Sequence, residues 1–131
     1  MDSRPTGRPN IYVAVVDDDE SLCRSFSRLL RLAGFQPIAY PSAEALLEDT
    51  KRPQFDCLVL DIQLPGMSGL DLRRRLEAMH DPTPVIFITA HDDPATRTEA
   101  QAIGCHGYFR KNEPGRVVMD AVQGATGISK L

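Results

Sequence analysis

Short apolar runs alternate along this chain with segments whose apolar residues recur at helical spacing. The runs at 57–60 and 85–88 are apolar without interruption, and β-branched residues dominate the run at 11–16. Runs of this length and composition predict strands. The predicted strands are Ile11–Val16, Gln36–Tyr40, Cys57–Leu60, Val85–Ile88 and Gly107–Arg110. Strands that are apolar on both faces are typical of a parallel sheet covered by helices on both sides, so the pattern predicts an α/β fold.

A helix is predicted after each of these strands, because apolar residues recur there three or four apart and helix start or stop signals flank them. The apolar positions are Leu22, Phe26, Leu29, Leu30 and Ala33 in the first helix, Leu72, Leu76 and Met79 in the third, and Val117, Val118, Ala121, Val122 and Ala125 in the last. Gly34 is the predicted stop of the first helix, and Ser42 is the predicted cap of a second helix that runs to about Asp49. Ser68 and Asp71 resemble a capping box at the start of the third helix. Pro94 starts and Gly104 stops the fourth helix, which runs to Ile103, and Pro114 starts the last one. Right-handed crossovers leave few topologies for such a chain.

Length and composition indicate one globular domain. The chain has 131 residues, of which 42% are hydrophobic and 25% charged, and its net charge is −3. This charge gives no strong positive potential that would indicate nucleic-acid binding. No apolar stretch reaches the ~18 residues of a membrane span. The polar segment 1–10 is predicted to be a flexible lead-in rather than a signal peptide. The domain is expected at 11–126, with a tail or the start of a linker at 127–131.

Cysteine usage indicates a reducing compartment. Cys23, Cys57 and Cys105 are odd in number and lack metal-ligand spacing. Free thiols are the ordinary state of cysteine in the cytoplasm, and we expect the protein there. His91 and His106 also lack the paired spacing of metal ligands.

Carboxylates stand at the ends of two predicted strands. Asp61 ends the apolar run that begins at Phe55, and an Asp-Asp-Asp-Glu cluster at 17–20 ends the first strand. The carboxyl ends of parallel strands meet at one edge of the sheet, where α/β folds bind ligands. Carboxylates gathered there repel one another, and a hard divalent cation resolves the repulsion. An alternative role for Asp19 or Glu20 is to cap the N-terminus of the following helix.

Four motifs, in this order along the chain, resemble the receiver domain of two-component response regulators. They are Val15-Val16-Asp17-Asp18, the segment from Leu58 through Asp61 to Gly69, the segment Val85-Ile86-Phe87-Ile88-Thr89-Ala90, and Gly107-Tyr108-Phe109-Arg110-Lys111. The resemblance covers about residues 11–126. It implies a flavodoxin-like, doubly wound fold with a five-stranded parallel sheet in the order 2-1-3-4-5, five helices, and a site at the carboxyl edge.

The resemblance also implies a metal site and a nucleophile. Asp61 would accept a phosphoryl group, and a carboxylate nucleophile yields an acyl phosphate. Asp18 would bind Mg²⁺ directly, and Asp17 would bind it through water. Gln63 would offer its backbone carbonyl to the metal, so the identity of its side chain would matter less there.

Three further residues are implied to respond to the phosphoryl group. Thr89 would donate a hydrogen bond to it and move in doing so, and Lys111 would pair with its charge. Tyr108 would be an aromatic residue whose rotamer reports activation, with core packing as the alternative. Phosphoryl transfer needs positioning and charge neutralisation above all, which suits this set. His91, two residues beyond Thr89, is expected at the rim of the site.

On this reading the chain is a signalling domain and not an enzyme in the ordinary sense. It would take a phosphoryl group from a partner histidine kinase or phosphotransfer protein and lose it by hydrolysis. Phosphorylation would bias the surface of the fourth helix, fifth strand and last helix, roughly Pro94 to Thr126, through which a homodimer is possible. The domain itself would bind neither nucleic acid nor membrane.

Two other functions stay open on the residues alone. The run Asp17-Asp18-Asp19-Glu20-Ser21 also fits the start of haloacid-dehalogenase-type phosphatases, in which Asp17 would be the nucleophile. In that phosphatase family, the loop that follows Asp61 here would have no known role. The other alternative is an interaction module that keeps the fold without phosphorylation, although a complete set of site residues argues against it.

One departure from the family pattern follows Lys111. The family usually has proline directly after this lysine, with a cis bond between them, whereas Asn112 stands here and proline returns at Pro114. A cis bond before a non-proline residue costs ~2.5–4 kcal/mol. We therefore predict a trans Lys111–Asn112 bond and a re-routed loop, with Glu113-Pro114-Gly115 at the start of the last helix.

Overall fold

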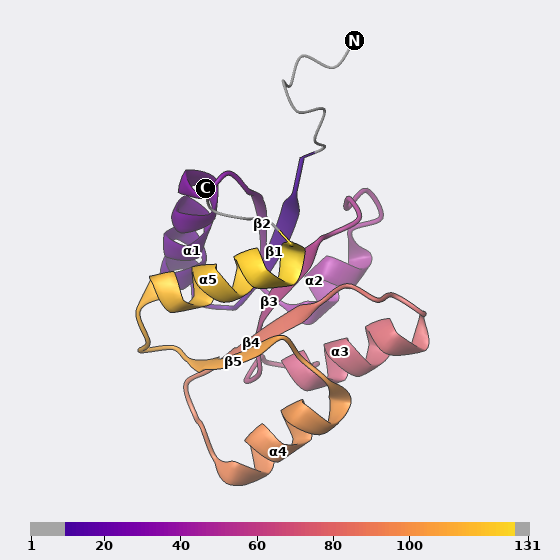
Figure 1. The fold of residues 1–131 in the computed structure, drawn as a ribbon. Coiled ribbons are helices and arrows are strands. Elements are labelled where there is room, and N and C mark those ends of the chain that lie inside the picture. Colours follow the sequence, from indigo (N-terminus) through magenta and orange to yellow (C-terminus); the bar gives the residue numbers. More distant parts are fainter. Residues whose placement is uncertain (1–9, 128–131) are drawn as a thin grey trace.

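The computed structural model describes residues 10–127 and contains one five-stranded parallel sheet (Figure 1). The strands are β1 Tyr12–Val16, β2 Gln36–Tyr40, β3 Cys57–Asp61, β4 Val85–Thr89 and β5 Gly107–Arg110. Their order in the sheet is β2-β1-β3-β4-β5, and each neighbouring pair is parallel. The predicted fold class and strand order are confirmed.

Helices connect the strands and cover both faces of the sheet. They are α1 Glu20–Leu32, α2 Ala43–Glu48, α3 Gly69–Ala78, α4 Pro94–Ile103 and α5 Gly115–Thr126. Figure 1 shows α1 and α5 together on one face, and α2, α3 and α4 on the other. This is the doubly wound arrangement that the alternating pattern predicts.

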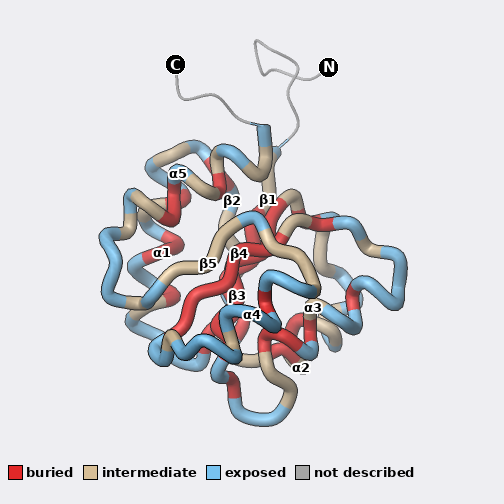
Figure 2. Tube along the Cα trace, turned by 60° about the horizontal axis from the view of Figure 1, so that its bottom comes forward, coloured by how far each residue is buried: buried red, intermediate tan, exposed pale blue. Residues whose placement is uncertain are grey.

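Two buried clusters lie on opposite sides of the sheet, because successive strand residues point to opposite faces. Val13 and Val15 of β1 pack with apolar residues of α1 and α5, whereas Ala14 and Val16 pack with those of α2, α3 and α4. Every residue of β3 and β4 is buried, and these strands form the centre of the molecule in Figure 2. The central strands therefore give the carboxyl edge a rigid base.

The helix ends follow the signals in the sequence. Asp19 caps α1 by accepting from the backbone N–H groups of the first turn, and Ser42 caps α2 in the same way. Ser68 and Asp71 form the predicted capping box of α3. After α1 the chain reverses at Gly34, whose φ of 94° is the conformation that glycine tolerates best.

Some predicted boundaries and one predicted core residue differ from the structure. β3 and β4 each run one residue further than predicted, so that Asp61 and Thr89 are the last residues of their strands. β1 begins at Tyr12 rather than at Ile11. Met79 was expected on the inner face of α3, but the helix ends at Ala78 and the Met79 residue is 50% exposed. A residue just past the last turn no longer follows the helical direction toward the core.

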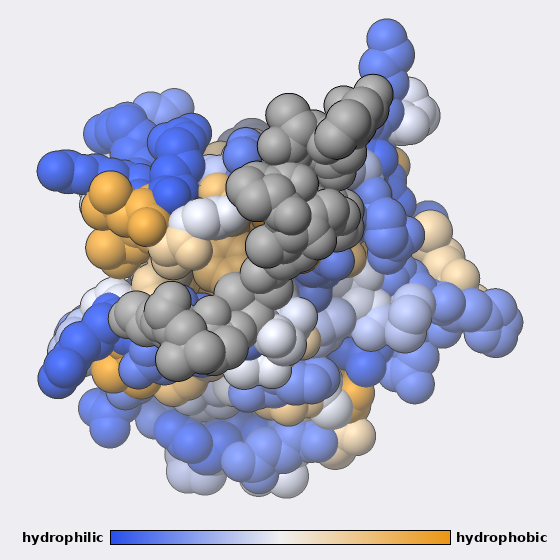
Figure 3. Space-filling view, turned by 45° about the horizontal axis from the view of Figure 1, so that its top comes forward, coloured by the Kyte–Doolittle hydropathy of each residue, from blue (hydrophilic) through white to orange (hydrophobic). Residues whose placement is uncertain are grey.

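Residues 1–9 of the predicted lead-in at 1–10, and residues 128–131 of the predicted tail at 127–131, lie outside the described residues. In the part of the chain that the structure does describe, no helix combines the length and the apolarity that crossing a membrane requires. The face in Figure 3 is mostly hydrophilic, with apolar side chains gathered in small areas.

Candidate functional site

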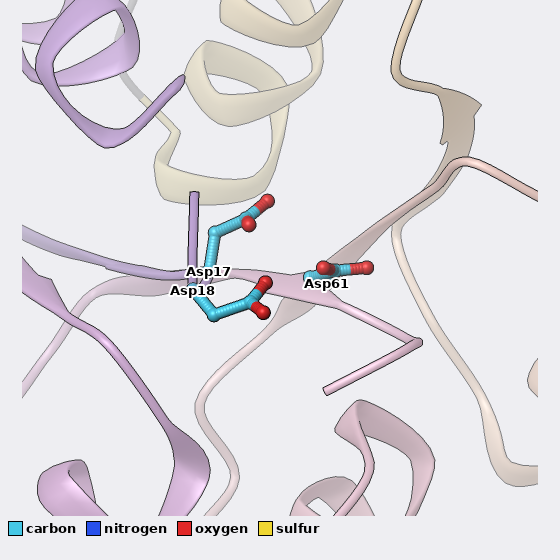
Figure 4. Close-up of side chains that lie close together, drawn as sticks. All are labelled: Asp17, Asp18 and Asp61. Carbon is cyan, nitrogen blue, oxygen red and sulfur yellow. The ribbon is translucent and has the colours of Figure 1, made fainter. Parts of the chain in front are cut away.

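The predicted site residues meet at the carboxyl edge of the sheet. Asp17 directly follows β1, Asp61 ends β3, Thr89 ends β4 and Lys111 directly follows β5. β1, β3, β4 and β5 are consecutive in the sheet, and the parallel direction brings their ends to one edge. Figure 4 shows the carboxylates of Asp17, Asp18 and Asp61 close together there, from the ends of two neighbouring strands.

Three carboxylates form a group that can hold a cation. One oxygen from each of Asp17, Asp18 and Asp61 lies within 4.8 Å of the others. Asp17 and Asp61 are buried, each only 1% exposed, whereas Asp18 is exposed. Backbone N–H groups orient the buried pair, because Asp19 donates to Asp17 Oδ1 at 2.8 Å and Gln63 donates to Asp61 Oδ1 at 3.0 Å. An all-oxygen donor set of this charge suits a hard divalent cation.

Lys111 places its ammonium between the two buried aspartates. Its Nζ lies 2.9 Å from Asp17 Oδ2 and 3.0 Å from Asp61 Oδ2. It donates a hydrogen bond to Asp61, whereas Asp17 Oδ2 accepts no hydrogen bond of regular geometry despite the ion pair. This buried oxygen therefore retains capacity for a further ligand, which fits a metal ion beside it.

The charges of this group alter its protonation. Burial raises the pKa of Asp61, and the nearby Asp17 carboxylate adds to the increase, while Lys111 opposes it. Burial by itself would lower the pKa of Lys111, but its contacts with Asp17 and Asp61 outweigh burial and raise that pKa. The lysine is therefore a fixed positive charge at the site at neutral pH.

The loop after Lys111 has the predicted trans form. Every peptide bond in residues 10–127 is trans, including the one between Lys111 and Asn112. Glu113 closes the turn, because its N–H donates to Arg110 O at 3.1 Å and its Oε2 accepts from the Arg110 N–H at 2.9 Å. Pro114 then stands at the N-cap position of α5, without a side-chain capping hydrogen bond. Lys111 reaches the carboxylates without the proline that usually follows it in the family.

Thr89 is hydrogen-bonded to protein atoms in this structure. Its Oγ1 lies 2.6 Å from Gln63 Oε1, and it also contacts the backbone O and N of His91 at 2.9 and 3.0 Å. Thr89 is buried, whereas His91 is exposed at the rim of the site, as expected. The Gln63 side chain, for which the sequence predicts no contact, therefore connects the loop after β3 with the end of β4. No local pattern indicates such a contact, because the two residues are 26 positions apart.

Tyr108 lies under a cationic side chain. Its ring packs against the cluster on the α2–α4 side, and the guanidinium carbon of Arg97 lies 4.5 Å from the ring centroid. The hydroxyl is buried without a hydrogen bond of regular geometry among the described residues. Burial, followed by the charge of Asp92, raises its pKa. The ring is packed but only partly buried, which is compatible with both expected roles of Tyr108: packing in the core and a rotamer that reports activation.

Close packing positions the loop that follows Asp61. A Cβ atom at Gly69 would lie 2.3 Å from the carbonyl oxygen of Asp61, so only glycine fits there. Glu44 of α2 accepts a hydrogen bond from the Met67 N–H at 2.8 Å, and this bond, more than any other cause, lowers the pKa of Glu44. No local sequence pattern indicates this contact of Glu44, because its partner lies 23 residues away.

The fold and the acidic edge agree with a known family. Residues 13–123 match the response regulator receiver domain, so the chain belongs to this family. It is a signalling domain of two-component systems, a class whose members interact with histidine kinases or phosphotransfer proteins.

Individual relatives give the same result. Nodulation protein W of Bradyrhizobium diazoefficiens is 39% identical over 114 residues, which cover 87% of this chain and 50% of that protein. Response regulator protein TodT of Pseudomonas putida is 32% identical over 113 residues, which cover 86% and 50%. A solved response regulator receiver protein from Burkholderia phymatum is 39% identical with a TM-score of 0.78, over 92% of this chain and 98% of that one. The chain thus spans about half the length of the curated relatives it matches.

Proposed function

We propose that Asp61 accepts a phosphoryl group from a partner histidine kinase or phosphotransfer protein. The observation that carries this proposal is the placement of Asp61, which is buried at a strand end, 3.0 Å from Lys111 Nζ and beside two further carboxylates. A carboxylate oxygen of Asp61 attacks phosphorus, and the bond from phosphorus to the donor nitrogen breaks. The product is an acyl phosphate, and hydrolysis by water returns the carboxylate and free phosphate.

Mg²⁺ is the proposed cofactor. Asp18 and Asp61 would hold it directly through carboxylate oxygens and Asp17 would hold it through water, with the backbone carbonyl of Gln63 as a further ligand. The unsatisfied Asp17 Oδ2 and the oxygen-only donors support this choice. When bound, the ion supplies positive charge that offsets the repulsion between nucleophile and phosphoryl oxygens.

Lys111 and Thr89 are the proposed phosphoryl ligands. Lys111 already faces the nucleophile as a compact positive charge. The Thr89 hydroxyl carries a single proton, so it must leave its acceptors at Gln63 and His91 before it can donate to a phosphoryl oxygen. Its movement would bias the surface of α4, β5 and α5, with Tyr108 as the responding aromatic.

That surface is also where we propose that a homodimer forms after phosphorylation. Hydrogen exchange with and without a phosphoryl mimic tests the response of the surface. Slower or faster exchange over α4, β5 and α5 is expected, and changes confined to the loop after Asp61 would contradict it.

We propose a cytoplasmic location, supported by Cys23, Cys57 and Cys105 as free thiols.

Intact-mass measurement tests the phosphoacceptor. The protein is incubated with Mg²⁺ and a small phosphodonor, and wild type should gain one phosphoryl group. Asp61→Asn should abolish the gain. A gain that persists in Asp61→Asn but is lost in Asp17→Asn would establish the phosphatase alternative. No gain in wild type would favour an interaction module that works without phosphorylation.

A further inference from the structure

A side chain of α2 holds the loop between β3 and α3. This loop, residues 62–68, contains neither strand nor helix, and its middle at Pro65 and Gly66 is exposed. Glu44 Oε2 accepts a hydrogen bond from the Met67 N–H at 2.8 Å. Among the described residues, no other side chain from outside β3, the loop and α3 hydrogen-bonds to the backbone of this loop. The exposed part of the loop therefore depends on Glu44 for its polar attachment to the rest of the protein.

The loop backbone comes very close to the Glu44 carboxylate. A Cβ atom at Gly66 would lie 2.6 Å from Glu44 Oε2, and Gly66 has a φ of 74°. Any other residue at this position would strain the backbone and would also push the carboxylate away from the Met67 N–H. Glycine therefore permits the contact that Glu44 makes.

Glu44 extends from a helix that is packed firmly against the core. Ala43 and Leu46 of α2 are buried in the same cluster as Leu64 of the loop, and Ser42 caps the helix. Protein interiors are close-packed, so a helix buried in this way has little room to shift. The core of the protein therefore determines where the Glu44 carboxylate can meet the loop.

The loop begins at the proposed phosphoacceptor, and Gln63 connects it to the site in two ways. The Gln63 N–H donates to Asp61 Oδ1 at 3.0 Å, and Gln63 Oε1 lies 2.6 Å from the hydroxyl oxygen of Thr89. The turn around Gln63 is closed by a hydrogen bond from the Leu64 N–H to Ile62 O at 3.1 Å. The Gln63 carbonyl, a proposed metal ligand, belongs to this turn, so the path of the loop determines where that carbonyl lies.

We propose that Glu44 is a positioning residue for the metal site, which holds the β3–α3 loop so that the Gln63 carbonyl stays within reach of Mg²⁺ bound at Asp18 and Asp61. This role rests on the proposed Mg²⁺ site. Glu44 acts through the loop, because its hydrogen bond is to Met67 and not to a site residue. Mg²⁺ demands near-ideal octahedral geometry, so its affinity is sensitive to partners that orient its ligands from outside.

The Mg²⁺ affinity of the unphosphorylated protein tests this role. Mg²⁺ is titrated while the backbone amide resonances near Asp18 and Asp61 are followed by NMR. Glu44→Ala should bind Mg²⁺ about 10-fold more weakly than wild type, the low end of what loss of an outer partner of a metal ligand costs. Glu44→Gln keeps an acceptor oxygen at the same reach and should bind within about 2-fold of wild type. Glu44→Asp keeps the charge but not the reach, and it should resemble Glu44→Ala.

The controls separate this role from a simple effect of charge. Removal of a carboxylate weakens cation binding through space, whatever the carboxylate contacts. Glu48→Ala is the matched control, because it removes a carboxylate from an exposed position of the same helix. Weakening in Glu48→Ala or Glu44→Gln as large as in Glu44→Ala would show that charge alone matters, and it would overturn the proposal.

Hydrogen exchange at Met67 provides a second readout. The Met67 N–H should exchange about 10-fold faster in Glu44→Ala than in wild type or Glu44→Gln, because the bond to Glu44 protects it. Faster exchange with unchanged Mg²⁺ affinity would mean that the contact only stabilises the loop, and the role of Glu44 at the metal site would be overturned alone. If wild type binds no Mg²⁺, the proposed metal site is wrong and the role of Glu44 falls with it.

Discussion

Gln63 Oε1 lies 2.6 Å from the hydroxyl oxygen of Thr89, across the mouth of the site between the loop after β3 and the end of β4. The contact joins a proposed metal ligand to the proposed switch residue. It competes for the hydroxyl that the phosphoryl group is proposed to take. The side chain of Gln63 therefore stabilises the resting position of Thr89, in addition to the backbone carbonyl to which the family resemblance assigns a role.

Gln63→Ala is expected to loosen Thr89. One hydrogen bond contributes about 0.5–1.5 kcal/mol net, so the ratio of Thr89 rotamers should shift about 2- to 12-fold away from the resting one. Three-bond couplings at the Thr89 methyl group report this ratio by NMR. Gln101→Ala, at an exposed position of α4, is the control and should change nothing. Unchanged couplings in Gln63→Ala would show that His91 alone positions the hydroxyl.

Gly69→Ala is expected to disturb the phosphoacceptor directly. The added methyl group would lie 2.3 Å from the carbonyl oxygen of Asp61, which is backbone and cannot turn aside. Overpacking of this kind costs about 1–3 kcal/mol of the free energy of unfolding. Gly124→Ala is the matched control, since a Cβ there meets nothing within 4 Å and should stabilise α5 by about 0.5–1 kcal/mol. Urea unfolding of both variants measures the difference, and a stable Gly69→Ala protein would contradict the close approach.

Lys111→Met is expected to make stability depend on Mg²⁺. Without the ammonium, Asp17 and Asp61 lose their common cation, and a hydrogen bond to a charged group contributes about 1.5–3 kcal/mol. Thermal unfolding without metal should therefore occur at a lower temperature than in wild type. Mg²⁺ should raise the melting temperature of the variant more than that of wild type, because a competing cation has been removed. Lys51→Met, at an exposed position, should behave like wild type, and an equal Mg²⁺ effect in both proteins would refute this account of Lys111.

The buried thiols are expected to resist alkylation. Burial is the main cause that raises the pKa of Cys57 to about 12 and that of Cys23 to about 11. At pH 8, about one Cys57 side chain in ten thousand would be the reactive thiolate. Iodoacetamide should leave Cys57 and Cys23 unmodified in the native protein, with reaction at the half-buried Cys105 first, as peptide mass analysis can show. Prior unfolding in urea should expose all three equally. Rapid native labelling of Cys57 would mean that the β3 core opens often.

Local signals in the sequence were enough for the framework of the fold. Helix caps such as Ser42 and the capping box of Ser68 depend on residues three positions apart, so a short window contains all the information. Strand placement followed from apolar runs, and the parallel arrangement followed from runs without alternation. Once Asp61 and the acidic cluster stood at strand ends, their meeting at one edge was a consequence of parallel topology.

Tertiary structure alone decided the contacts within and around that edge. The Gln63–Thr89, Glu44–Met67 and Arg97–Tyr108 pairs join residues that are distant in sequence, or depend on which rotamer a long side chain adopts. The reach of Lys111 past Asn112 likewise depends on how the β5–α5 loop packs. Sequence periodicity predicts which face of a helix or strand is apolar. Contacts between side chains form only when the layers pack against one another. The sequence therefore predicted which residue types lie at the site, but not which residues they contact.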